Sequence, residues 1–282
     1  MAEHFELSPE AEQELYPFKK NLPNRIRLQE IVRSSGRIEN QDCLEIGASS
    51  GPFSYHLRRL GGQWESVSGT EAAARQVQPF VAGQVHVMDG ATLPFKKKGE
   101  FDIIIVMDML ETLTEGEAFI EECHNLLKPG GRLIVSVRNR KAWSLIASLR
   151  HLLGLEPPAN QMREKGYTEA DLFYLLKDGF DVMQVRTYSR FFVELTQAFV
   201  QFFERRTRAG GETTQTAKKI RRLHRTAGFI YELAYQLDLL LFFNRGNSMI
   251  AMAKRRAWHP RKTPVLVDGR SISEAVLSKA AD

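Results

Sequence analysis

The chain has 282 residues, 43% of them hydrophobic and 26% charged, which is the composition of an ordinary folded globular protein. Its two cysteines, Cys43 and Cys123, lie inside apolar stretches, so they predict neither a disulfide framework nor a metal site and suit a reducing cytoplasm. The acidic amino terminus lacks the apolar core of a secretory signal. No run of residues reaches the roughly 18–20 apolar residues of a membrane-spanning helix.

Basic charge is concentrated late in the chain. Residues 186–262 carry 16 Lys and Arg against 5 Asp and Glu, whereas residues 1–185 carry 21 against 26. Such an excess indicates a segment that faces an anionic partner or is heavily solvated.

The first part of the chain predicts helices, a strand and a glycine turn. Residues 1–22 are expected to form a loosely attached lead-in, and residues 24–32 a short amphipathic helix. Residues 43–47 are typical of a buried strand. The small residues from Gly47 to Gly51 then form a tight turn before a helix over 52–60. Such a turn presents backbone N–H groups to a ligand, but its spacing is not the Gly-x-Gly-x-x-Gly of dinucleotide binders.

Strands and helices alternate through the middle of the chain. Further strands are expected at residues 64–69, 85–88, 101–107, 132–137 and 181–188, and helices at 72–80, 115–127, 139–159 and from Thr168 onward. Residues 101–107 are nearly all apolar, as a strand buried on both faces requires. Residues 128–131 indicate a helix stop and a tight turn. This alternation predicts a parallel, doubly wound sheet.

Residues 189–246 show a helical pattern before a seventh strand at 248–254. Phenylalanine-rich faces are flanked there by Arg205, Arg206, Arg208, Lys218, Lys219, Arg221, Arg222 and Arg225. Three interpretations stay open: a lid whose aromatic residues form its own core, an interfacial surface for a lipid-linked or anionic substrate, or RNA binding. The last is weakened because no RNA-binding module is recognisable.

Five stretches resemble, in order and spacing, the class I S-adenosylmethionine-dependent methyltransferases of the type-11 group. The resemblance covers about residues 40–188, with the seventh strand near 248–254. The stretches are Leu44-Glu45-Ile46-Gly47 with Gly51; Val67-Ser68-Gly69-Thr70-Glu71; Met88-Asp89-Gly90 with Leu93-Pro94-Phe95 and Phe101-Asp102; Leu110-Glu111-Thr112-Leu113; and Leu126-Leu127-Lys128-Pro129-Gly130-Gly131.

The resemblance implies an α/β, Rossmann-like fold. Its sheet has seven mostly parallel strands in the order 3-2-1-4-5-7-6, flanked by helices, with a helical insertion between strands 6 and 7. The expected parts are lead-in helices at 1–40, the methyltransferase domain at 41–188 plus 247–256, a basic, aromatic-rich helical cap at 189–246 and a peripheral tail at 257–282.

The resemblance also implies an S-adenosylmethionine site, with the methionine part of the cofactor lying on the bare backbone of Gly47 and Gly51. Glu45 is expected to orient the turn and its contacts to the cofactor's amino group, and Glu71 to accept hydrogen bonds from the ribose hydroxyls. Asp89 would accept from the adenine amino group. The other expected cofactor contacts are Ala48, Ser49, Met88, Gly90 and Met107. The alternative is that Glu71 and Asp89 are solvated acids at strand ends.

Some positions depart from the family pattern. Ser49 replaces a common middle glycine, and Thr112 stands where many members carry histidine, so no base role is transferred there. Ser136-Val137-Arg138-Asn139 lacks a proline that many relatives have before the asparagine. Four histidines of the resembling region, His56, His86, His124 and His151, are more typical of packed or surface positions, so no catalytic base is assigned. No metal site is expected.

The implied reaction is an in-line methyl transfer to a small-molecule acceptor, which is hydrophobic or linked to a lipid or glycan. A cytoplasmic protein is expected, with peripheral contact to an anionic membrane through residues 205–225. A non-catalytic cofactor-binding protein that uses the cap for partner contacts and an RNA methyltransferase are the alternatives. The lack of an Asn-Pro-Pro-Tyr or Asp-Pro-Pro-Tyr element argues against base-flipping methylation of nucleic acid. The sequence leaves the acceptor atom and the oligomeric state open.

Overall fold

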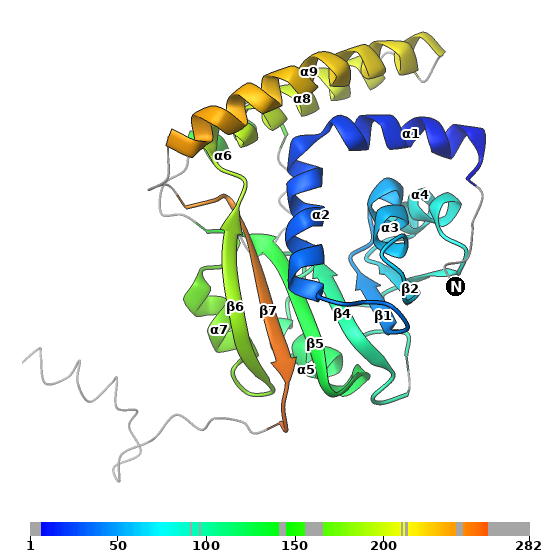
Figure 1. The fold of residues 1–282 in the computed structure, drawn as a ribbon, viewed down its shortest axis with the longest axis vertical. Helices are drawn as coiled ribbons and strands as arrows, with labels where there is room; N and C mark the ends of the chain where they lie inside the picture. Colours follow the sequence, from blue (N-terminus) through cyan, green and yellow to red (C-terminus); the bar gives the residue numbers. More distant parts are fainter. Residues whose placement is uncertain are drawn as a thin grey trace, which may run out of the picture.

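A computed structural model describes residues 7–90, 92–95, 97–140, 145–155, 166–209, 211, 214–240 and 245–258. Seven strands form one sheet in the order β3-β2-β1-β4-β5-β7-β6, which confirms the predicted topology (Figure 1). The strands are β1 (Asp42–Ile46), β2 (Gln63–Ser68), β3 (Val85–Val87), β4 (Phe101–Met107), β5 (Leu127–Arg138), β6 (Phe180–Tyr188) and β7 (Ser248–Arg255). Strands β1 to β5 pair in parallel, and β7 runs antiparallel to both of its neighbours.

Helices cover both faces of this sheet. They are α1 (Pro9–Lys20), α2 (Leu22–Ser35), α3 (Gly51–Arg58), α4 (Glu71–Val77), α5 (Gly116–Leu126), α6 (Leu145–Leu152), α7 (Glu169–Leu176), α8 (Phe191–Arg208) and α9 (Thr214–Leu240), with a 3-10 turn, η1 (Gln78–Phe80). Alternate residues of β4 serve the two faces. Ile103 and Ile105 pack with α1, α2 and α3, whereas Ile104 and Val106 pack with α5 and α7. The continuous apolar run of β4 is therefore explained by burial on both sides.

The amino-terminal helix α1 is packed onto the fold, so the prediction of a loosely attached lead-in is wrong. Ala11, Leu15 and Phe18 are buried on α1, which lies against α2, α3 and α9. The Ser8 side chain accepts a hydrogen bond from the Ala11 N–H at 3.2 Å and caps this helix. The anchored helix brings Tyr16 beside basic side chains of α9.

Two further segments differ from the sequence prediction. Residues 128–131 are not a turn before the strand but the irregular beginning of β5, whose register shifts against β4 between Phe101 and Ile103. The helix predicted over 139–159 is present only as α6. Residues 141–144 and 156–165 lie outside the described residues, as do 259–282 of the predicted tail. The helix predicted from Thr168 onward is present as α7 and begins with a capping box, in which the side chains of Thr168 and Asp171 each accept a hydrogen bond from the other's backbone N–H.

The helical cap consists of α8 and α9, which lie side by side at one end of the sheet (Figure 1). Val193, Val200, Ala227 and Tyr231 bury their side chains between these helices and Leu22 of α2. Of the three interpretations left open, a lid with a core of its own aromatic residues fits only in part, because Tyr231 is buried there but Phe199, Phe203 and Phe229 are exposed. Mainly small or aliphatic side chains fill the interior.

Asp238 of α9 locks the two cap helices together. Its buried carboxylate accepts hydrogen bonds from the N–H groups of Phe192 (2.8 Å) and Val193 (3.0 Å) at the start of α8. The insertion is closed at its base, where the Asn247 N–H donates to the Ser189 carbonyl at 2.8 Å. None of the helices in the described part of the chain is long and apolar enough to cross a membrane.

Candidate functional site

The carboxyl ends of β1, β2 and β3 line up at one edge of the sheet. Ile46 is opposite Val67, and Ser68 is opposite Val87. The N–H groups of Gly47 and Ala48 both donate to the Val67 carbonyl, at 2.9 and 3.0 Å, so the turn after β1 folds over the end of β2. Glycine is required at the first position, because its φ is 85° and a Cβ would lie 2.0 Å from the Met107 carbonyl oxygen.

The other residues of this turn differ in burial and packing. Ser49 is exposed, and Ala48 is buried. Gly51 is glycine for a packing reason, because a Cβ there would lie 2.0 Å from the Phe80 ring. Its small size therefore makes room for a core aromatic residue beneath the turn.

Two exposed acids stand at the ends of the neighbouring strands. Glu71 opens α4 after β2, with 77% of its side chain exposed, and its only ion pair in the described chain is to Arg75 at 2.9 Å. Asp89 follows β3 and is also exposed. Beside it Gly90 has a φ of 62°, and no atom lies within 4 Å of a Cβ built there. The sequence-predicted acids are thus brought to one open edge.

Glu45 is placed differently, because it is fully buried. Its carboxylate oxygens accept hydrogen bonds from Ser54 Oγ (2.7 Å), Ser66 Oγ (2.8 Å) and the Arg58 guanidinium (3.3 Å). Glu45 therefore ties β1 to α3 and β2. This arrangement supports the predicted role in holding the turn, whereas the carboxylate itself is occupied by donors of the protein.

The methionines near this edge also separate into different roles. Met88 is buried with Leu93, and Met107 is buried among the side chains that hold α1, α2 and α3. Met109 lies over the ends of β1 and β2. A Cβ on Gly47 would be 2.8 Å from Met109 Cγ, and one on Gly69 would be 3.2 Å from its Sδ. A ligand that crossed these two strand ends would contact or displace this unbranched side chain.

A second group of polar side chains follows the ends of β4, β5 and β6. Asp108 has a φ of 51° and pairs with Arg27 of α2, with Nη1 2.8 Å from Oδ2. The Nε and Nη2 atoms of Arg27 are buried and have no hydrogen-bond partner among the described residues. Tyr188 of β6 shares a 3.0 Å hydrogen bond with Ser136 Oγ of β5. Burial raises the pKa of the Tyr188 phenol, and the charges of Arg27 and Asp108 also act on it.

Glu111 is the most unusual side chain of this second group. It is 2% exposed, and its Oε1 accepts a hydrogen bond from the Arg138 N–H at 2.7 Å. Its Oε2 is buried without a partner in the described chain. Burial, reinforced by the charge of Asp108, raises the pKa of this carboxyl to about 7. Glu111 can therefore exchange a proton near neutral pH.

Comparison with known proteins identifies the domain that carries these strands. Residues 44–135 match the family model of a methyltransferase domain. The ubiquinone biosynthesis O-methyltransferase of Sodalis glossinidius is 25% identical over 169 residues, which cover 55% of this chain and 66% of that protein. The corresponding enzyme of Cupriavidus pinatubonensis is 25% identical over 172 residues, or 58% and 69% of the two chains. Residues 44–135 thus carry a methyltransferase domain.

The match spans just under two thirds of the length of the Sodalis relative. Among solved structures, the [4+2]-cyclase SpnF has a TM-score of 0.54 at 16% identity, covering 82% of this chain and 80% of that one. The MccD protein has a TM-score of 0.52 at 13% identity, covering 84% and 99%. At these identities the neighbours show the fold alone.

The carboxyl-end edge of the sheet contains functional candidates that sequence reasoning missed. Arg27 and Tyr188 come from segments remote from the motifs, and no local pattern marks either residue. Glu111 lies in the stretch Leu110-Glu111-Thr112-Leu113, for which the sequence prediction considered only Thr112 as a base position. Its position four residues after the end of β4 was the available signal, because side chains that follow strand ends line the ligand edge of such sheets.

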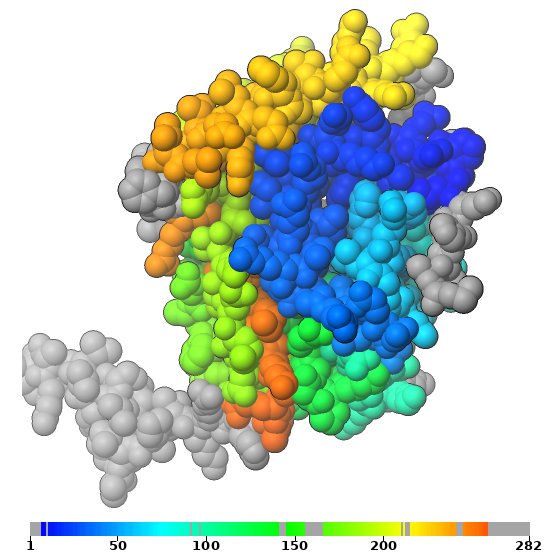
Figure 2. Space-filling model, viewed as in Figure 1, coloured from blue at the N-terminus to red at the C-terminus, as the bar shows by residue number. Residues whose placement is uncertain are grey.

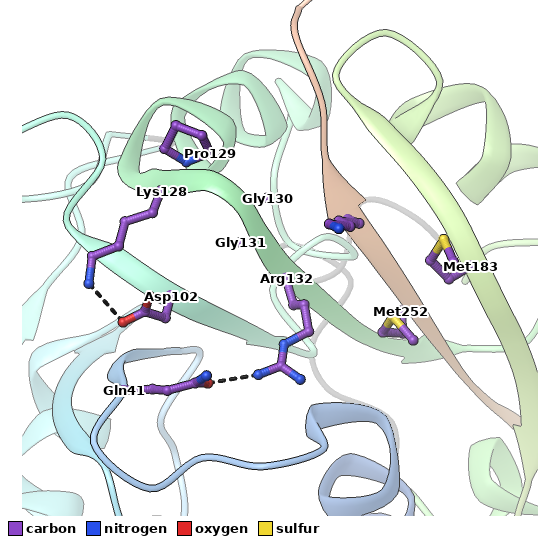
Figure 3. A pocket seen from close by; sticks show the side chains of 10 residues that line it. Gln41, Asp102, Lys128, Pro129, Gly130, Gly131, Arg132, Met183 and Met252 are labelled. Atoms are coloured by element: carbon purple, nitrogen blue, oxygen red, sulfur yellow. Dashed lines mark hydrogen bonds and ion pairs between the residues drawn. The ribbon is translucent and has the colours of Figure 1, made fainter.

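An open pocket of about 430 Å³ lies at the opposite edge of the sheet, where β1 and β4 begin (Figure 3). Lys128 Nζ is 2.7 Å from both Asp42 and Asp102, and Arg132 donates to the Gln41 side chain at 2.7 Å. The charges at this edge are thus paired with one another across three strands. The cavity is part of a structural clamp and lies away from the methyltransferase motifs.

Proposed function

We propose that this protein transfers the methyl group of S-adenosylmethionine to an oxygen of a hydrophobic small molecule, one linked to a lipid or a glycan. The observation that carries the proposal is the open edge at which Glu71, Asp89 and Gly90 meet the glycine turn. Exposed carboxylates at adjacent strand ends suit the hydroxyl and amino donors of an adenosine.

Each residue of this edge would have a defined task. Glu71 would accept from the ribose hydroxyls, Asp89 would accept from the adenine amino group, and Gly90 would leave room for the ring. The turn from Gly47 to Gly51, with Glu45 holding it from beneath, would bring the backbone N–H groups of its second half, after Ala48, to the polar end of the ligand. The bound cofactor supplies an activated methyl group on a sulfonium.

The chain would align the acceptor and remove its proton. The names of the relatives, ubiquinone biosynthesis O-methyltransferases, favour an oxygen acceptor. A hydroxyl acceptor must lose a proton, and Glu111 Oε2 lies buried in the segment after β4, without a hydrogen-bond partner among the described residues. With its raised pKa, Glu111 is the candidate for holding that proton.

Calorimetric titration of S-adenosylmethionine and its demethylated product tests the cofactor step. The Glu71→Ala variant should bind at least about tenfold more weakly than the parent chain, because two charge-assisted hydrogen bonds are lost. Arg75→Ala is the matched control. It removes the other half of the exposed Glu71–Arg75 pair and should bind within about twofold of the parent. Equal binding by parent and Glu71→Ala would contradict the assignment, and no binding at all would remove the enzymatic interpretation.

Two other functions stay within reach of a specific test. Tight cofactor binding without methyl transfer to any member of a broad acceptor panel would favour a non-catalytic binding protein. An RNA substrate would show affinity that falls steeply with salt and that is lost when Lys218, Lys219, Arg221 and Arg222 are neutralised.

A further inference from the structure

The outer face of α9 carries a row of exposed apolar side chains. Phe229, Leu233 and Leu240 are 78%, 56% and 71% exposed, and their spacing of four and seven residues puts them on one side of the helix. Ile230 and Leu237 widen the row and are also exposed. Scattered apolar residues on a surface are ordinary, but five on one helix face over three turns form a patch that requires an explanation.

The same helix is strongly basic in its first half. Lys218, Lys219, Arg221, Arg222 and Arg225 are all exposed and line, with Tyr16 of α1, a hollow of about 460 Å³. The Arg221 guanidinium lies 4.6 Å from the centre of the Tyr16 ring, which holds one wall of the hollow in place. In the described part of the chain, none of these five cations forms an ion pair with an acid.

The acids of α9 do not offset this charge. Asp238 is buried and caps α8 through the N–H groups of Phe192 and Val193. Glu232 is exposed but lies 3.6 Å from Arg25 of α2, so its charge is offset by a cation outside α9. The outer face therefore presents cations followed by apolar side chains along about 27 Å of helix, from Arg222 to Leu240 at 1.5 Å per residue.

The position of α9 exposes this face to a broad surface. The helix runs along the outer ridge of the molecule, over α8 and beside α1, at the end of the sheet where the parallel strands terminate (Figures 1 and 2). A lipid interface suits such a ridge, because apolar side chains enter the acyl boundary while Lys and Arg contact the phosphate groups. Phosphate contacts to RNA would leave the leucines and the isoleucine unexplained.

We propose that the outer face of α9 docks the protein flat on an anionic phospholipid bilayer, through the cations 218–225 and the apolar residues 229–240. This site shifts the membrane contact predicted at 205–225 toward the carboxyl end of α9. It is independent of methyl transfer, since it rests on the surface alone. Docked in this way, the protein turns the ligand edge of its sheet toward the bilayer.

Co-sedimentation of the full chain with phosphatidylcholine vesicles, prepared with and without phosphatidylglycerol, tests the proposal. The parent chain should bind the anionic vesicles at low salt and bind the neutral ones at least about tenfold more weakly. A triple variant, Phe229→Ser, Leu233→Ser and Leu240→Ser, should lose at least about tenfold in affinity for the anionic vesicles, because its apolar anchors are gone. Lys218→Gln with Lys219→Gln and Arg222→Gln should abolish the preference for anionic lipid.

A matched control comes from α7, which exposes Phe173 and Tyr174 at 52% and 60%. Changing both to serine removes similar exposed apolar area elsewhere and should leave vesicle binding unchanged. Circular dichroism melts of all variants would establish whether each is folded. A parent chain that stays in the supernatant at low salt, or a triple α9 variant that binds like the parent, would overturn the proposal. RNA binding that survives the triple α9 variant, without vesicle binding, would assign the basic hollow to nucleic acid.

Discussion

Glu45 and Glu111 are buried carboxylates in the two halves of the same sheet edge. Both oxygens of Glu45 accept hydrogen bonds, whereas one oxygen of Glu111 has no donor among the described residues. Glu45, beneath the glycine turn, accepts from two serines and pairs with the Arg58 guanidinium. Glu111, at the end of β4, has one backbone donor, an orphan oxygen and the like charge of Asp108 nearby. A buried charge that is fully partnered holds structure, whereas one left partly unpartnered is available for proton exchange.

The largest effect is expected for Glu45→Gln. The change removes the charge opposite Arg58, whose guanidinium is only partly exposed, and it should lower the free energy of unfolding by about 3 kcal/mol. Chemical denaturation measures this loss. Glu71→Gln serves as the control, because it breaks an exposed pair and should cost less than about 1 kcal/mol. Equal losses in the two variants would erase the distinction between a structural and a surface carboxylate.

Glu111→Gln should raise the free energy of unfolding at high pH, whereas Glu45→Gln lowers it. Because the folded-state pKa is raised to about 7, the protonated carboxyl stabilises the fold fully below its ordinary value of 4.5, and this contribution is lost as the pH rises through about 7. Between about pH 5 and pH 8 the parent chain should lose about 2 to 3 kcal/mol relative to the glutamine variant.

Denaturation of both proteins across this pH range measures the difference. Glu115→Gln, an exposed position that makes no side-chain cap bond, should follow the parent chain. Parallel pH profiles for the parent and the Glu111→Gln variant would show that Glu111 titrates normally and would end its candidacy as a proton acceptor.

Gly51→Ala tests whether the glycine turn is shaped by packing as well as by its ligand. The added Cβ would meet the Phe80 ring at 2.0 Å, so a loss of about 2 kcal/mol is expected. A Phe80→Leu change made in the same chain should recover part of that loss. Gly83→Ala is the control, because its nearest neighbour is the Trp64 carbonyl oxygen at 4.0 Å. An unaffected melting temperature for Gly51→Ala would show that the ring can move freely.

The smallest effect is expected for Tyr188→Phe in the second half of the edge. Loss of the 3.0 Å hydrogen bond to Ser136 should cost about 1 kcal/mol, and cofactor affinity should stay within about twofold of the parent. Thermal melts and calorimetry measure the two quantities. The exposed phenol of Tyr174 supplies the control in Tyr174→Phe. A large drop in cofactor affinity would place Tyr188 in the cofactor half after all.

The contrast between the halves also explains what the sequence could predict. The strands were predictable because β1 and β4 are short, largely apolar runs followed by glycine or aspartate, and Glu71 and Asp89 come within three residues of the ends of β2 and β3. The second half depends on pairs that are distant along the chain. Arg27 and Asp108 are 81 residues apart, and Ser136 and Tyr188 are 52 apart. Such contacts follow from tertiary packing, and no local spacing announces them.

The lead-in helix shows a different reason for a missed prediction. Ala11, Leu15 and Phe18 do form a helical stripe after Ser8 and Pro9, which are typical of a helix start. Pro17 interrupts the pattern, and the partners of the stripe lie on α2, α3 and α9. Burial of this helix therefore depended on surfaces that only the assembled fold provides.

The hydrogen bond between Ser189 and Asn247 has an evolutionary consequence. It joins the first and last residues of the cap, directly after β6 and directly before β7. An insertion that starts and finishes at one bonded pair can be lengthened, exchanged or lost while the paired strands keep their register. The sheet and the cap can thus change in sequence and length independently of each other.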